Sequence, residues 1–201
     1  SEYEKMAEYI YEMAAGKQGN YMVFFPSYRM LEDIYEIFRK KAEERQFEVS
    51  CILQSSNMTE QEREEFLEAF QENSAKTLIG FCVMGGIFSE GIDLTGERLI
   101  GAAIVGTGLP QVGCEREILK NYYDEKAQNG FAYAYRYPGM NKVLQAAGRV
   151  IRTKEDRGVV LLLDERFLQR EYLELFPQEW QGYERCTVGN AGQKIRAFWN
   201  S

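Results

Sequence analysis

The feature that most constrains this chain is the alternation of short apolar runs with longer amphipathic segments. Five runs have the length of a β-strand and are predominantly apolar, as is typical of strands buried on both faces of a parallel sheet. They span residues 21–25, 48–53, 76–83, 99–106 and 158–164. The helical periodicity of the other segments predicts helices at residues 2–15, 29–45, 59–71, 114–128, 138–153 and 193–199. The pattern predicts an α/β fold with a parallel sheet and helices on both faces.

The loops that follow the strands carry the unusual residues of this chain. They read PSYRM after the first strand, QSSN after the second, MGGIFSEGID after the third and TGLPQ after the fourth. Parallel sheets bind their ligands outside the carboxyl ends of the strands. We therefore expect the functional site at that edge of the sheet.

A length of 201 residues suits one α/β domain. We expect a leading helix (1–16), a core (17–175) and a C-terminal helical tail (176–201). No apolar run approaches the roughly 18 residues that span a bilayer, and no secretory signal opens the chain, so a cytoplasmic protein is expected. The chain begins directly on an amphipathic helix, which is compatible with a piece excised from a larger protein.

The composition excludes several kinds of site. There is no histidine, so imidazole metal sites and Ser–His or Cys–His catalysis are excluded. Cysteines 51, 82, 114 and 186 form no Cys-x-x-Cys pair, and those at 51 and 82 fall in strands, where buried reduced thiols are expected. No metal site is predicted. The formal net charge is −7, yet residues 136–170 carry eight bases against four acids, a local excess of four.

That basic region contains the stretch LQAAGRVIRTKEDRG, residues 144–158. Gln145, Gly148, Arg149 and Arg152 are spaced i, i+3, i+4 and i+7, which predicts one shared helix face. A glycine inside a helix costs about 1 kcal/mol relative to alanine, so a close ligand explains Gly148 better than stability does. Paired guanidinium groups suit a triphosphate. The alternative is a solvated face on which Arg152 pairs with nearby acids.

A second stretch, GGIFSEGIDL at residues 85–94, follows the third strand. Its glycines allow the backbone to lie close to a phosphate, and Ser89 could donate to a phosphate oxygen. Glu90 and Asp93 would repel phosphate, so we expect them to face an arginine or a ribose hydroxyl. The alternative is an irregular crossover loop with glycines at its turns. The phosphate-binding G-x-x-x-x-G-K-[ST] and the dinucleotide-binding G-x-G-x-x-G are both absent.

The two stretches carry a family resemblance. QAAGRVIR (145–152) resembles helicase motif VI of superfamily 2, and GGIFSEGIDL resembles its motif V. VFFPSYRMLEDI (23–34) and GVVLLLDERF (158–167) resemble the flanking segments in the DinG/XPD family of DNA helicases. The resemblance covers most of the chain in the family's order. It implies the second, C-terminal RecA-like motor domain, a P-loop NTPase-like fold that lacks the P-loop itself.

The resemblance also implies roles for individual residues. In such helicases ATP lies between two motor domains, and the second domain supplies arginines. It implies that Arg149 and Arg152 approach the γ-phosphate, one of them as an arginine finger, with Gln145, Gly148 and Gly91 in the same cleft. Asp93, with Glu90, would link the ribose to the arginines. Ser27, Tyr28, Ser89 and Gly86 match positions near the single-stranded DNA backbone, although Tyr28 has an equal alternative role in packing on the sheet.

Several features of the family are missing from this chain. The Walker motif, the acidic box and the four clustered cysteines of an iron–sulfur domain belong to the first half of the family's chains. We therefore expect the first motor domain of the same parent to be a partner that binds most of the ATP and Mg²⁺. An iron–sulfur cluster, if the parent has one, would lie outside this chain. The chain alone should not hydrolyse ATP, and it should contact DNA mainly at phosphates because no dense aromatic and basic ladder is evident.

Two other functions fit part of the pattern. One is a non-catalytic nucleic-acid-binding or partner-docking module that retains the helicase-like fold, with the acidic first third as a protein interface. The other is an unrelated α/β enzyme such as a methyltransferase, which would need a glycine-rich loop after the first strand, where this chain has FFPSYR.

Overall fold

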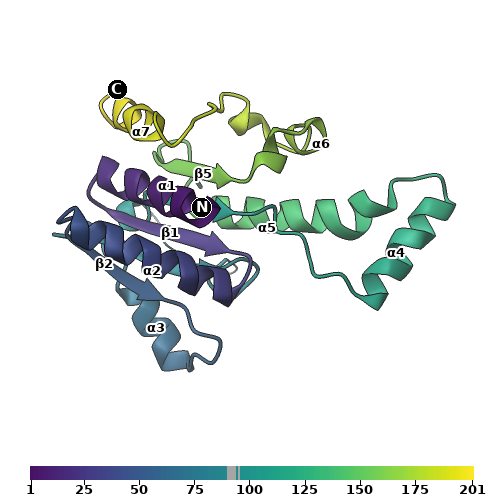
Figure 1. Ribbon diagram of the computed structural model, residues 1–201, viewed down its shortest axis with the longest axis horizontal. Coiled ribbons are helices and arrows are strands. Elements are labelled where there is room, and N and C mark those ends of the chain that lie inside the picture. The colour runs from purple at the N-terminus through teal and green to yellow at the C-terminus, as the bar shows by residue number, and fades with distance from the viewer. Residues whose placement is uncertain (90–93, 95) are drawn as a thin grey trace.

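A five-stranded parallel sheet forms the centre of the molecule (Figure 1). The computed structural model describes residues 1–89, 94 and 96–201. The strand order is β2-β3-β1-β4-β5. The strands are β1 (Asn20–Phe25), β2 (Val49–Leu53), β3 (Thr77–Val83), β4 (Gly101–Val105) and β5 (Val159–Leu163). All five predicted strands are confirmed, and so is their parallel arrangement.

Helices cover both faces of the sheet. One core cluster joins the sheet to α1 (Glu2–Gly16), α2 (Tyr28–Glu44) and α7 (Ala191–Trp199). The other joins it to α3 (Glu60–Glu68), α5 (Tyr137–Ala147) and the short α6 (Arg170–Leu173). The predicted α/β fold with helices on both faces is therefore confirmed.

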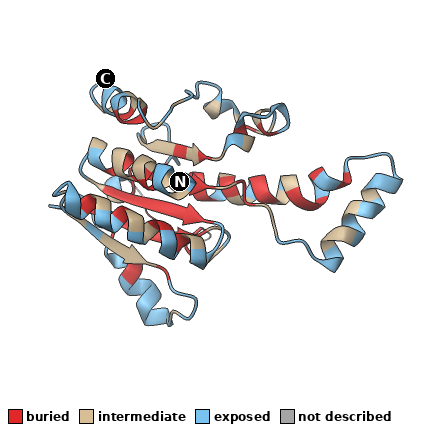
Figure 2. Ribbon diagram, viewed as in Figure 1, coloured by how far each residue is buried: buried red, intermediate tan, exposed pale blue. Residues whose placement is uncertain are grey.

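Strand β1 lies in the middle of the sheet and is buried along its whole length (Figure 2). Successive side chains of a strand point to opposite faces. Tyr21, Val23 and Phe25 accordingly pack in the α1–α2 cluster. Met22 and Phe24 pack in the α3–α5 cluster. The uninterrupted apolar run YMVFF is thus explained by two helical layers, one on each side.

The helix predicted at residues 138–153 begins earlier than the prediction. A five-residue π-helix, Ala132–Arg136, runs directly into α5. Pro138 has no N–H and cannot bond to the carbonyl of Ala134, four residues earlier. That carbonyl instead accepts a hydrogen bond from Nη1 of Arg116 at 3.2 Å, while the Tyr137 N–H bonds to the Ala132 carbonyl. The wider turn and the arginine together satisfy the backbone around the proline.

The same helix ends earlier than predicted, because α5 stops at Ala147 and Gly148 is its C-cap. The N–H groups of Arg149 and Val150 each bond three residues back, which tightens and closes the last turn. Beyond it, the carboxylate of Asp156 accepts hydrogen bonds from the main-chain N–H groups of Arg152 and Thr153, both at 2.8 Å. A side chain that binds main-chain donors in this way competes with a continuing helix. The prediction that Arg152 shares a helix face with Gln145 is therefore wrong.

Helix α4 (Cys114–Glu125) and the π-helix form a hairpin that extends away from the sheet (Figure 1). Helix α4 has no buried residue. Tyrosine rings join its two arms: Tyr123 stacks on Tyr133 with centroids 4.2 Å apart, and Tyr122 and Tyr137 extend this row at either end. The fold therefore brings together tyrosines from two segments, a row that neither segment of the sequence indicates by itself.

Candidate functional site at the carboxyl edge of the sheet

The loops after the strands meet at the carboxyl edge, as the parallel arrangement predicts. The N–H of Met84, just after β3, bonds to the carbonyl of Phe25, the last residue of β1, at 2.7 Å. The N–H of Gln54, just after β2, bonds to the carbonyl of Phe81 at 2.8 Å. These main-chain bonds hold the candidate loops to one another.

Gln54 ties three of these loops together. Its side chain is buried, its Oε1 accepts a hydrogen bond from the Val83 N–H at 2.9 Å, and its Nε2 donates to the Tyr28 hydroxyl at 3.3 Å. Sequence reasoning singled out the loop QSSN but missed this residue. The available signal was a polar amide placed directly after a strand, where a buried main-chain N–H would need an acceptor.

Ser27 and Tyr28 lie at the N-terminus of α2. Ser27 is exposed, and its Oγ accepts a hydrogen bond from the Met30 N–H at 3.2 Å as the N-cap. Tyr28 is half-buried against the α1–α2 cluster, and Gln54 donates to its hydroxyl. Tyr28 therefore packs against the core beside the sheet, which is the alternative role predicted for it. DNA contact by either residue stays a prediction.

The loop after β3 carries Gly85, Gly86 and Ser89. Gly85 has φ +74, a backbone conformation that favours glycine, and a Cβ there would lie 3.3 Å from the Lys142 side chain of α5. Ser89 is buried, and its hydroxyl donates to the Gly86 carbonyl at 2.9 Å. In this arrangement the hydroxyl of Ser89 fixes the turn and does not face solvent, so its contact with DNA stays a prediction.

Arg149 connects the two stretches that carry the family resemblance. It is half-buried, and its Nε and Nη2 both donate to the Ser89 carbonyl, at 3.2 and 2.9 Å. Ser89 lies sixty residues earlier in the sequence. The guanidinium is therefore positioned by the main chain of the glycine-rich loop, a contact that no spacing in the sequence indicates.

The other predicted nucleotide residues lie around the end of α5. Gln145, Gly148 and Arg152 are exposed. Arg152 lies past the helix, on the turn whose N–H groups bind Asp156, and those bonds lower the pKa of the Asp156 carboxyl. Glu90, Gly91 and Asp93 lie outside the described residues.

The described ranges hold neither a candidate metal cluster nor a membrane-spanning helix. Residues 1–89, 94 and 96–201 contain no cluster of three cysteine, aspartate or glutamate side chains that could hold a metal ion. Burial raises the pKa of the Cys51 thiol to about 12 and also raises the pKa of Cys82. Within the same part of the chain, no helix is long and apolar enough to cross a membrane.

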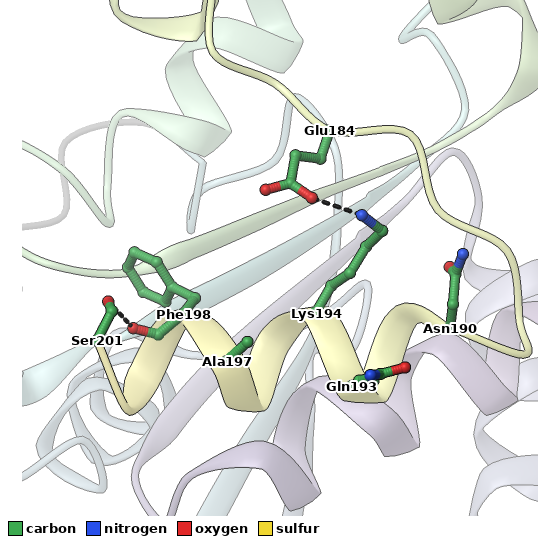
Figure 3. A pocket seen from close by; sticks show the side chains of 7 residues that line it. All are labelled: Glu184, Asn190, Gln193, Lys194, Ala197, Phe198 and Ser201. Carbon is green, nitrogen blue, oxygen red and sulfur yellow. Dashed lines mark hydrogen bonds and ion pairs between the residues drawn. The ribbon is translucent and has the colours of Figure 1, made fainter.

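A hollow of about 600 Å³ lies elsewhere, on the C-terminal helix (Figure 3). Lys194 of α7 bonds there to Glu184 at 2.6 Å, and the Ser201 hydroxyl bonds to the Phe198 carbonyl at 2.6 Å. The other lining residues are Asn190, Gln193 and Ala197. None of the predicted site residues lines it, so the hollow is separate from the candidate site.

The family model described as the helicase C-terminal domain matches residues 10–183. The chain belongs to this family. Regulator of telomere elongation helicase 1 from Bos taurus is 34% identical over 161 residues, which cover 73% of this chain and 13% of that protein. The Drosophila melanogaster homolog is 30% identical over 200 residues, which cover 90% of this chain and 20% of the homolog.

A bacterial relative agrees with this assignment, and two solved structures share the fold. The ATP-dependent DNA helicase DinG from Photobacterium profundum is 29% identical over 153 residues, covering 75% of this chain and 21% of DinG. The structure of apo XPD matches with a TM-score of 0.66 at 21% identity, over 87% of this chain and 34% of XPD. A second XPD helicase structure matches with a TM-score of 0.65. The structural matches show the fold, and the chain spans about a fifth or less of these sequence relatives.

Proposed function

We propose that this chain is the second motor domain of an ATP-dependent DNA helicase and that it supplies arginines to an ATP site completed by a first motor domain. The observation that carries the proposal is the contact between Arg149 and the Ser89 carbonyl at the carboxyl edge of the sheet. It places a guanidinium at the edge where parallel sheets bind ligands, and it joins the two helicase-like stretches.

The residues of this edge fit a triphosphate. A guanidinium is planar and keeps its charge, so an arginine fixed by the main chain can present N–H donors in a set direction. Arg149 is fixed in this way, and Arg152 follows it on an exposed turn. In the proposal Gln145 and Gly148 border the same cleft, and Glu90, Gly91 and Asp93 complete it. Mg²⁺ would be held by the first motor domain, since the described residues offer no ligand cluster of their own.

The proposed DNA contacts lie on the neighbouring part of the edge. The exposed Ser27 stands at the N-terminus of α2, where main-chain N–H groups and the helix dipole favour a phosphate. Gly86, in the loop after β3, lies beside the Gln54 side chain. The Ser89 carbonyl accepts hydrogen bonds from the Arg149 side chain. In the proposal, the loop that faces DNA is therefore bonded directly to the arginine that faces the nucleotide. We propose that phosphate contacts dominate, with Tyr28 positioned by Gln54.

The test is the substitution Arg149→Ala in the parent protein that carries both motor domains. An arginine that stabilises the transferring phosphoryl group contributes about 10³–10⁵ in rate, so DNA-stimulated ATP hydrolysis should fall at least about a thousandfold. The affinity for ATP, followed with a fluorescent analogue, should change much less. The matched control is Arg157→Ala, because Arg157 lies on the same segment but donates to Phe198 and Ser201 in the C-terminal tail. Turnover within threefold of wild type for Arg149→Ala would refute the assignment.

A second candidate function is a partner-docking module without motor activity. It is favoured by exposed apolar side chains: Ile118 and Tyr122, one turn apart on α4, are 64% and 50% exposed, and Val112 before the helix is 80% exposed. Large exposed apolar side chains on one helix face are typical of interaction surfaces. The same ATPase measurement separates the two functions, because a parent without DNA-stimulated hydrolysis would support docking alone.

A further inference from the structure

Lys142 of α5 lies beside the glycine-rich loop that follows β3. A Cβ added to Gly85 would lie 3.3 Å from Cδ and Cε of Lys142 and 3.5 Å from its Nζ. Gly85 has φ +74 and no side chain, so the stem and the ammonium group of the lysine both lie close to the main chain of the loop. Lys142 is half-buried there, whereas a lysine that needs only solvation extends its ammonium group into water.

The charge of Lys142 is not used within the described part of the chain. Lys142 forms no ion pair and no hydrogen bond with any described residue. Other cations of the carboxyl edge do have internal partners: Arg149 donates to the Ser89 carbonyl, and Arg166 pairs with Asp164 at 2.7 Å. The ammonium group of Lys142 is therefore available to an anion from outside the chain.

Lys142 and Arg149 contact opposite ends of the same loop. Lys142 lies beside Gly85 near the beginning of the loop, and Arg149 bonds to the carbonyl of Ser89 farther along it. Seven residues of helix correspond to roughly 10 Å along the axis, so the two cations reach different parts of the carboxyl edge.

The surroundings of Lys142 lead toward the proposed DNA contacts. Gly86 follows Gly85 and lies beside the Gln54 side chain. Gln54 donates to the hydroxyl of Tyr28, the first residue of α2. The loop therefore connects two features that attract a phosphate, which are the ammonium group and the N-terminus of α2.

We propose that Lys142 binds a phosphate of single-stranded DNA beside the Gly85–Gly86 main chain. An ammonium group is a compact charge with three donors, so it can hold successive phosphates of a strand that moves past it. The glycines let the DNA backbone approach the loop closely. Lys142 lies outside both helicase-like stretches, so this contact adds a residue to the site. The inference rests on the proposed function, specifically on its DNA binding.

The experiment uses the parent protein with both motor domains and compares Lys142→Ala, Lys142→Arg and Lys40→Ala with wild type. Fluorescence anisotropy measures the binding of a labelled oligothymidylate at several salt concentrations. ATP hydrolysis is measured with DNA and ATP varied in turn, because ATP is the other source of phosphate. Lys40 is the matched control, since it is an exposed lysine near the other end of α2 and its loss changes the net charge equally.

Each phosphate bound on a single strand contributes about 0.7 to the slope of log K against log salt, so Lys142→Ala should make this slope shallower by about 0.7. The advantage of wild type over this variant should shrink about threefold between roughly 50 and 250 mM salt. Lys142→Arg and Lys40→Ala should keep the wild-type slope. In the hydrolysis assay, Lys142→Ala should raise the DNA concentration that gives half-maximal rate, with kcat at saturating DNA and KM for ATP unchanged. A purely structural defect lowers the active fraction without changing the slope.

Three results would overturn the inference. One is a wild-type salt slope for Lys142→Ala. Another is a raised KM for ATP or a lowered kcat at saturating DNA, which would assign Lys142 to the nucleotide. The third is an equal change of slope in Lys40→Ala, which would show an effect of net charge alone. Failure of the motor proposal differs from all three, because wild type itself would lack DNA-stimulated hydrolysis while the salt slope, which needs no ATP, would still decide the role of Lys142. A wild-type parent that binds no DNA would overturn both.

Discussion

Replacing Gln54 by alanine tests the network that holds the loops of the candidate site. The change removes the acceptor of the Val83 N–H, a bond of 2.9 Å in a buried position. A buried donor left without a partner costs about 1–3 kcal/mol, and the longer bond to Tyr28 adds roughly 0.5 kcal/mol. We expect the free energy of unfolding to fall by about 2 kcal/mol, which corresponds to a decrease in Tm of roughly 4–8 °C for a domain of this size.

The assay is urea unfolding followed by circular dichroism, analysed by linear extrapolation. Two controls separate the contributions. Tyr28→Phe removes only the hydroxyl and should cost less than about 1 kcal/mol. Gln61→Ala removes an exposed glutamine that donates to Glu65 on α3, and should change stability by less than about 0.5 kcal/mol. If Gln54→Ala were no more destabilising than Gln61→Ala, water must satisfy the Val83 N–H and the reasoning would be wrong.

Two further predictions concern packing and pH. Gly139→Ala should destabilise the chain by about 1–3 kcal/mol, because the added Cβ would lie 2.6 Å from the Thr107 main-chain carbonyl oxygen. The control is Gly182→Ala, whose Cβ would meet nothing within 4 Å and should leave stability unchanged. Thermal unfolding of both variants measures the difference. The Glu8 carboxylate accepts from Arg45 at 2.8 and 2.9 Å and pairs with Lys41 at 2.8 Å, contacts that lower the pKa of Glu8 below its ordinary value. A lowered folded-state pKa stabilises the chain above the unfolded value and ceases to do so as the pH falls through the folded value. Urea titrations from pH 7 to pH 3 should therefore show a smaller loss for Glu8→Gln than for wild type, and parallel curves would exclude a role for this pair.

The sheet was predictable because its signal is local. Continuous apolar runs such as YMVFF are typical of strands buried on both faces, and this pattern predicted all five strands and their parallel arrangement. The ends of α5 were not predictable in the same way. Its extension across Pro138 depends on Arg116 from another helix, and its end at Gly148 is followed by a turn that Asp156 holds. Both depend on partners that the periodicity of one segment does not contain.

The site was predictable in outline. The rule that parallel strands end at a common edge placed the loops containing Ser27 and Gly86 together. The contacts within that edge were not predictable, because the bond from Arg149 to Ser89 joins residues sixty positions apart and the acceptor is a main-chain carbonyl. Gln54 was missed for a related reason: its role is to satisfy a main-chain N–H that only the folded sheet buries.

The strand order has a consequence for how the polypeptide is made. Asn20 of β1 pairs with Leu78 on one side, and Tyr21 pairs with Gly101 on the other, while β2 pairs with β3. A ribosome that has synthesised this chain only as far as residue 70 has therefore exposed β1 and β2 with no neighbouring strand for either. The sheet can assemble only after β3 emerges, and β1 gains its second neighbour later still, so a nascent chain stalled before Thr77 should remain protease-sensitive and dependent on chaperones.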